Sequence, residues 1–332
     1  MTINSNDQIR LTNNFGKYND VVLKFIKTLY TNSVLLYDKQ YQGRNRTNTQ
    51  DFDKQKIRDS INYVVDYLYY YYNFYKEDFY DIFMQLIKEL KYVTVLKPGD
   101  RGIYGMYESL EKCLYINPEM KSSSNLNSNA RIRLYINHEL GHVINSRWMW
   151  LIEQYLNITS IPRKYSKQLI YDGFSLLDEA TTQNRAEDIT YYYLGKNRPN
   201  KNNCRSMLFR GVSYQTNYDY YGEMQTPATV FARTLRGIGH ITNDDLALKK
   251  LCDRALKYDF SSDIVYEYEQ DGQLDNLYNL FQNLGIIKNA SYAAFGMADK
   301  KYLSQSLPAL NNFILLATKL RDRRPPLLKK VK

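Results

Sequence analysis

The stretch Ala130-Arg-Ile-Arg-Leu-Tyr-Ile-Asn-His-Glu-Leu-Gly-His-Val-Ile144 carries the clearest structural pattern in the chain. Its hydrophobic residues recur every three or four positions, and no proline interrupts residues 130–149. This spacing places the apolar side chains on one face of an α-helix. The sequence therefore predicts a helix whose core-facing residues are Ile132, Ile136, Leu140, Val143 and Ile144.

The same helix contains the pentapeptide His138-Glu139-Leu140-Gly141-His142, an H-E-x-x-H pattern. Side chains four residues apart share a helix face, so both imidazoles can reach one metal ion while Glu139 leans over the same point. Zinc held by neutral histidines and a carboxylate lowers the pKa of a bound water towards ~7, and the glutamate of the motif acts as general base. The pattern predicts a zinc ion and hydrolysis, most often of a peptide bond.

The alternative is a chance arrangement of two histidines on a solvated helix face. Against it, the chain has only three histidines among 332 residues, and two of them lie in this pentapeptide. Gly141 is the one weak helix former of the segment and costs up to about 1 kcal/mol relative to alanine. Such a glycine indicates that another part of the protein approaches the helix closely there.

A zinc site of this type needs a third ligand from outside the pentapeptide. The best candidate is Glu179, on a downstream segment that we expect to be helical, because two helices facing each other could then supply His, His and Glu. Asp178, Glu187 and Glu223 are alternative ligands. The other interpretation of Glu179 is a solvated acidic residue near a helix N-terminus.

The pentapeptide, followed by a helix bearing Asp178-Glu179-Ala-Thr-Thr-Gln183, resembles the gluzincin branch of the zinc metallopeptidases, within the zincin superfamily. That resemblance spans residues 103–195 and implies a two-helix core. In the family, a carboxylate one turn after the third ligand orients a histidine, and here Gln183 occupies that position, which leaves Gln183 or Glu187 for the role. The zinc ligands that the resemblance implies are His138, His142 and Glu179, with Glu139 as general base.

The segment Tyr221-Gly-Glu-Met-Gln-Thr-Pro-Ala-Thr-Val-Phe-Ala-Arg233 is similar to one in lethal-factor-like peptidases. That family carries a metal-binding glutamate before Phe-Ala, where this chain has Thr229, so the resemblance leaves only Tyr221 to approach the site. Hydrolysis also needs a donor for the developing oxyanion. His240 and Tyr221 are the candidates, and the alternative for His240 is a structural histidine beside a glycine turn.

The order of elements predicts an α+β fold in which helices dominate and a small mixed sheet precedes the H-E-x-x-H helix, as in a zincin-like core. A sheet whose edge strand runs beside the metal would let a peptide pair with it as an added strand. Gly102 and Gly105 suit such close approach, or belong to an ordinary hairpin. The predicted helices before the sheet are residues 20–39, 53–76 and 79–90, and the predicted strands are 92–96, 103–107 and 113–117.

After the motif, Ser175-Leu-Leu-Asp178 is typical of a helix start, so we expect the third-ligand helix to begin there, to carry Glu179 in its first turns and to end near Gly195. Further helices are expected over residues 228–235, 244–258, 271–284 and 307–320. The predicted domains are an N-terminal helical region (1–91), the zincin core (92–200), a C-terminal helical lobe that completes the cleft (201–318) and a basic tail (319–332).

Composition limits the class of protein. The formal net charge is +10, but only the tail concentrates it, and no aromatic nucleic-acid motif accompanies the 33 tyrosines, so we expect no DNA or RNA partner. The widely spaced Cys113, Cys204 and Cys252 fit a reducing compartment. The polar N-terminus and the lack of long apolar runs predict no transmembrane segment, and a location in the cytoplasm or export without a cleaved signal peptide.

These observations predict a zinc metallopeptidase, an endopeptidase acting on a protein or peptide substrate. One alternative is a basic protein that binds nucleic acid or an anionic membrane surface, with a structural metal or none, which the charge of +10 favours. The other is a translocated toxin or effector protease that acts on a host or competitor protein. Substrate, cleavage specificity and oligomeric state stay open.

Overall fold

The computed structural model describes residues 14–41, 47–76, 79–97, 105–122, 126–158, 161–196, 274–294 and 298–322. These residues form two compact units, the first of residues 14–146 and 182–196 and the second of residues 147–181 and 274–322. Two long helices, α4 (Ser128–Ile158) and α5 (Lys167–Leu194), contribute to both units.

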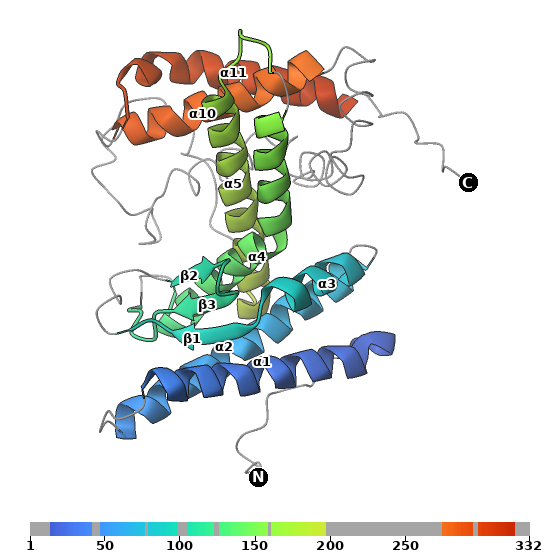
Figure 1. Cartoon of the computed structure of the whole chain (residues 1–332), viewed down its shortest axis with the longest axis vertical. Coiled ribbons are helices and arrows are strands. Elements are labelled where there is room, and N and C mark those ends of the chain that lie inside the picture. Colours follow the sequence, from blue (N-terminus) through green and yellow to red (C-terminus); the bar gives the residue numbers. More distant parts are fainter. Residues whose placement is uncertain are drawn as a thin grey trace. The chain divides into compact units, whose positions relative to one another are not determined.

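The first unit contains a three-stranded sheet with helices against it (Figure 1). The strands lie in the order β1-β3-β2, with β1 parallel and β2 antiparallel to the central β3. The α+β prediction with a mixed sheet and mostly helical structure is therefore confirmed. The elements before α4 are α1 (Asn19–Gln40), α2 (Thr47–Phe74), α3 (Phe79–Glu89), β1 (Tyr92–Val95), β2 (Gly105–Glu108) and β3 (Cys113–Ile116).

One hydrophobic core joins the sheet to the helices of this unit. The apolar stripe of α2 is buried, and it packs with side chains of α1, α3, β1, β3 and α4. Burial of such residues contributes about 25 cal/mol per Å² of apolar surface, which makes this core the main source of stability. Its members from α2 and α4 include Ile57, Ile61, Val64, Leu68, Ile132, Ile136, Leu140 and Val143.

A tyrosine of α2 and a tyrosine of α5 hold an arginine of α4 in place. The guanidinium of Arg133 lies 4.5 Å from the ring centre of Tyr63 and 4.8 Å from that of Tyr193 on α5. Its Nη1 is also 2.8 Å from a carboxylate oxygen of Asp66. Burial raises the pKa of Asp66, and Arg133 opposes that shift. The cation–π contacts and the ion pair together fix the position of α4 beside α2.

The second unit contains the first part of α5, α10 (Leu274–Ala294) and α11 (Lys301–Asp322). Glycines allow α5 and α10 to touch through their backbones, because a Cβ at Gly173 would collide with the carbonyl of Phe281. The rings of Phe174 and Phe281 stack with centres 3.6 Å apart. Lys288 of α10 donates to the hydroxyl of Ser175 over 3.1 Å.

Three predicted helix starts are wrong. Helix α2 begins at Thr47 instead of residue 53. Helix α5 begins at Lys167, so Ser175 lies within it and Glu179 sits mid-helix rather than in the first turns. The hydroxyl of Ser166 accepts the N–H of Leu169 over 3.3 Å, which is the bond of an N-cap. Helix α11 begins at Lys301 instead of residue 307 and continues through Pro308.

Other predicted elements lie outside the described residues, namely the helices at 228–235 and 244–258 and most of the tail at 319–332. The described helices include none with an apolar stretch that would cross a membrane. The predicted domain boundaries stay predictions.

A side chain of α1 forms a hydrogen bond with the outer edge of β1. The buried Ser33 hydroxyl accepts the backbone N–H of Val93 over 2.9 Å and donates to the carbonyl of Leu29 over 2.6 Å. Ser33→Ala would leave the Val93 N–H without this acceptor, so we expect the free energy of unfolding to fall by about 1–3 kcal/mol. Urea unfolding measures this as a lower midpoint with an unchanged m-value.

Thr28→Ala is the matched control, because Thr28 makes the same hydroxyl-to-carbonyl bond, to Lys24, on the exposed side of α1. We expect its effect to stay within about 0.5 kcal/mol. Equal stabilities of the Ser33 variant and the wild type would show that this edge does not depend on the serine.

Candidate metal centre

Helix α4 holds the H-E-x-x-H residues in a fixed orientation because it is packed on more than one side. The predicted apolar face is buried in the main core. On another side, Ala130 and Leu134 pack with Ala186 and Tyr191 of α5. His138 and His142 lie on the remaining face, where both are half-buried.

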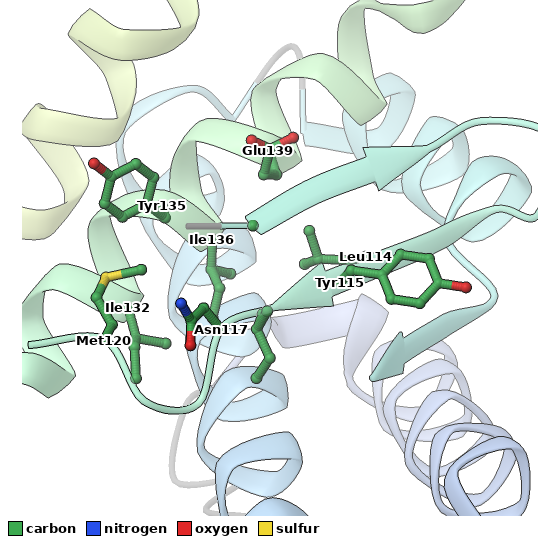
Figure 2. A pocket seen from close by; sticks show the side chains of 10 residues that line it. Leu114, Tyr115, Asn117, Met120, Ile132, Tyr135, Ile136 and Glu139 are labelled. Carbon is green, nitrogen blue, oxygen red and sulfur yellow. The ribbon is translucent and has the colours of Figure 1, made fainter. Parts of the chain in front are cut away.

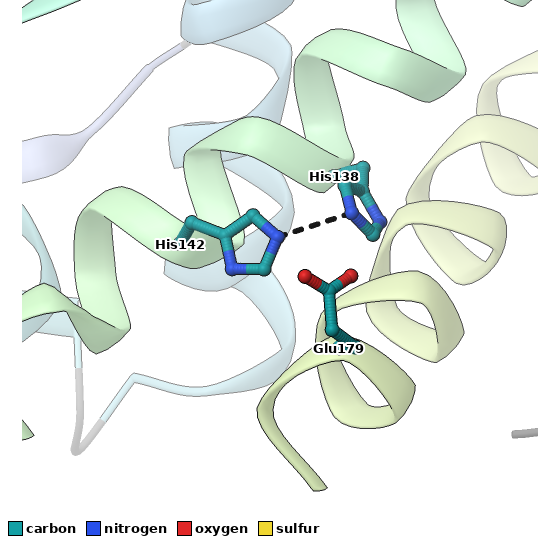
Figure 3. Close-up of side chains that lie close together, drawn as sticks. All are labelled: His138, His142 and Glu179. Atoms are coloured by element: carbon teal, nitrogen blue, oxygen red, sulfur yellow. Dashed lines mark hydrogen bonds between the residues drawn. The ribbon is translucent and has the colours of Figure 1, made fainter. Parts of the chain in front are cut away.

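The structure brings His138, His142 and Glu179 together (Figure 3). The two Nε2 atoms are 3.1 Å apart, and the ring planes are inclined by 83°. One ligand atom from each of the three residues lies within 4.8 Å of the other two. In a tetrahedral zinc site, bonds of about 2.0–2.1 Å place neighbouring donors about 3.3 Å apart, so the two imidazoles fit such an ion and the Glu179 carboxylate is close enough to complete the set.

The rival third ligands occupy different positions. Within the described part of the chain, the His, Cys, Asp and Glu group able to hold a metal contains Glu179 and neither Asp178 nor Glu187. Asp178 is buried, and the buried Glu187 accepts a hydrogen bond of 3.0 Å from the side-chain amide of Gln183. The two residues considered for orienting a histidine therefore bond to each other.

The remaining candidates, Glu223, Tyr221 and His240, lie outside the described residues, as does Thr229. The oxyanion donor thus stays a prediction from sequence.

Glu139 points to the edge of the sheet. Its Oε2 accepts the backbone N–H of Tyr107 over 2.9 Å. Among the described residues β2 pairs with β3 alone, so this N–H points away from β3, off the other edge of β2. The Tyr107 hydroxyl donates to the carbonyl of Glu89 over 2.9 Å, and burial raises its pKa. Sequence reasoning missed Tyr107, since a backbone donor leaves no signal in residue type.

A pocket opens beside Glu139, between β3 and α4 (Figure 2). It encloses about 200 Å³ of empty space, its open mouth included. Most of its wall is apolar. The lining residues are Gly105, Leu114, Tyr115, Ile116, Asn117, Met120, Ile132, Tyr135, Ile136 and Glu139.

Comparison of the chain with models of protein families, with curated proteins and with solved structures found no match. The chemistry of the site follows from its geometry. Two imidazoles and one carboxylate converge on one point, and a second carboxylate stands one residue away on the same helix, at the edge of a sheet. A His₂Glu group of this kind could hold a metal ion.

We predict that Glu179→Gln lowers zinc affinity at least about tenfold, because an amide oxygen is a weaker ligand than a carboxylate. Asp178→Asn is the matched control, an isosteric change at the neighbouring position that we expect to leave affinity within about threefold. Zinc titration against a chromophoric chelator measures both. The opposite ranking of the two variants would transfer the ligand role to Asp178.

Proposed function

We propose that this protein is a zinc-dependent metallopeptidase with a zincin-like core, and that it acts as an endopeptidase on protein or peptide substrates. The observation that carries the proposal is the close approach of His138, His142 and Glu179. Glu139 follows His138 in the sequence, and its carboxylate is bonded to the edge of the sheet. When bound there, zinc would lower the pKa of a water molecule towards ~7 and polarise a carbonyl group.

Side chains of the protein supply metal binding and proton transfer. His138, His142 and Glu179 bind the ion, two of them from one helix and the third from another. Glu139 is offset from the histidines, so its carboxylate is suited to take a proton from the attacking water and to pass it to the leaving amine. The hydrogen bond from the Tyr107 N–H fixes the direction in which this carboxylate points.

Strand β2 supports a peptide as the substrate. It is an edge strand of the sheet, and its outward N–H at Tyr107 is in contact with the general base. Gly105, two residues earlier, presents its backbone groups on the same side of the strand. An extended peptide pairing along this edge would bring a scissile bond next to Glu139.

The test of the mechanism is Glu139→Gln. We expect this variant to bind zinc as the wild type does and to lose about 10²–10⁴-fold or more of its hydrolysis rate, since it lacks the base but keeps every ligand. Cleavage of a peptide library by both proteins, followed by mass spectrometry, measures the rate. Undiminished cleavage by the zinc-loaded variant would rule out Glu139 as the base.

A further inference from the structure

We propose that Thr182 is a positioning residue that sets the distance between Glu179 and the two histidines through its contact with Gly141. This inference rests on the proposed zinc site. It concerns a residue that binds neither metal nor substrate, and it gives the glycine of the H-E-x-x-H pentapeptide a defined role.

The contact between the two helices is unusually close. A Cβ added at Gly141 would lie 2.5 Å from the Cγ2 of Thr182, 3.0 Å from its Oγ1 and 3.1 Å from its Cβ. Atoms of this kind do not approach to 2.5 Å, so only glycine fits at this position unless the Thr182 side chain or α5 shifts. Gly141 and Thr182 are both buried and both belong to the first unit.

Hydrogen bonds hold the helices in one register around this contact. The amide of Asn145 donates to the hydroxyl of Thr182 over 3.3 Å, and that of Asn137 donates to the hydroxyl of Thr190 over 2.9 Å. All four side chains are buried. Numbers rise along α4 as they fall along α5, so the two helices are antiparallel here, with one hydrogen bond on either side of Gly141.

The metal ligands stand directly next to this contact. Gly141 precedes His142, and Thr182 follows Glu179 by about one helical turn. Because α5 is continuous from Lys167 to Leu194, a displacement at Thr182 moves Glu179 with it. Metal–ligand distances must be held within about 0.2 Å, so even a small increase in helix separation should weaken binding.

Four variants are expected to differ in their affinity for zinc. Gly141→Ala should weaken zinc binding about 10–100-fold, the range seen when groups behind the ligands are altered. Adding Thr182→Ala to it should restore part of that loss, because the two nearest Thr182 atoms are removed. Thr182→Val keeps the shape and loses only the long 3.3 Å bond from Asn145, so it should bind zinc within about threefold of wild type. Thr182→Ile adds one methyl group at the contact and should bind more weakly.

The experiment titrates the purified full-length chain and each variant with Zn²⁺ against a chelator, and with Co²⁺ while recording its visible absorption. Thermal unfolding without metal is measured in parallel. Ser33→Ala is the control for stability alone, and we expect it to unfold earlier without a change in metal affinity.

Weaker zinc binding by Gly141→Ala, relieved by Thr182→Ala, with an altered Co²⁺ spectrum in Thr182→Ile but not in Thr182→Val, would support the inference. Wild-type affinity in both Gly141→Ala and Thr182→Ile would overturn it while leaving the zinc site in place. If Gly141→Ala does not fold, the comparison of Thr182→Val with Thr182→Ile tests the inference by itself. Absence of metal binding by the wild type would instead overturn the proposed function.

Discussion

Helices α4 and α5 approach each other so closely at Gly141 that one added methyl group would meet Thr182 at 2.5 Å. The candidate metal centre depends on this approach, because its two histidines and its glutamate come from different helices. Helix α4 supplies two of the donors, four residues apart, and α5 supplies the third. Buried threonines and asparagines, rather than apolar contacts alone, fix how far one helix can slide along the other.

The sheet adds a second constraint. Its two edge strands are hydrogen-bonded by side chains of different helices. An exposed edge offers unpaired backbone groups to any passing strand. At β1 the Ser33 hydroxyl of α1 accepts the N–H of Val93, so this outward backbone donor is satisfied within the protein. At β2 the carboxylate that takes the N–H of Tyr107 belongs to Glu139, the proposed base. An edge bonded to a reactive side chain suits a site in which a peptide replaces or extends that contact.

Part of the fold and of the candidate metal centre could be predicted from the sequence. The helical spacing of Ile132, Ile136 and Leu140 predicts α4 and its buried face, because local periodicity directly reports which side is apolar. The placement of Glu179 near the histidines followed from the need for a third donor on a nearby helix. The start of α5 could not be read correctly, because Ser175 has the sequence context of a cap but binds Lys288, far away in the chain.

The roles of Tyr107 and Thr182 could not be predicted from the sequence either. One acts through its backbone N–H and the other through contact with a glycine on another helix, and neither leaves a local pattern. Sequence indicated only that something must approach Gly141, not which residue does so. Interactions between segments distant in the chain therefore account for both the wrong helix start and the missing site residues.

X-ray absorption at the zinc edge, on protein loaded with one equivalent of metal, tests the central claim most directly. The account predicts a single zinc with nitrogen and oxygen ligands at about 2.0–2.2 Å, with the multiple scattering of two imidazole rings. A spectrum with sulfur ligands or without imidazole scattering, or a protein that retains no zinc at all, would contradict it.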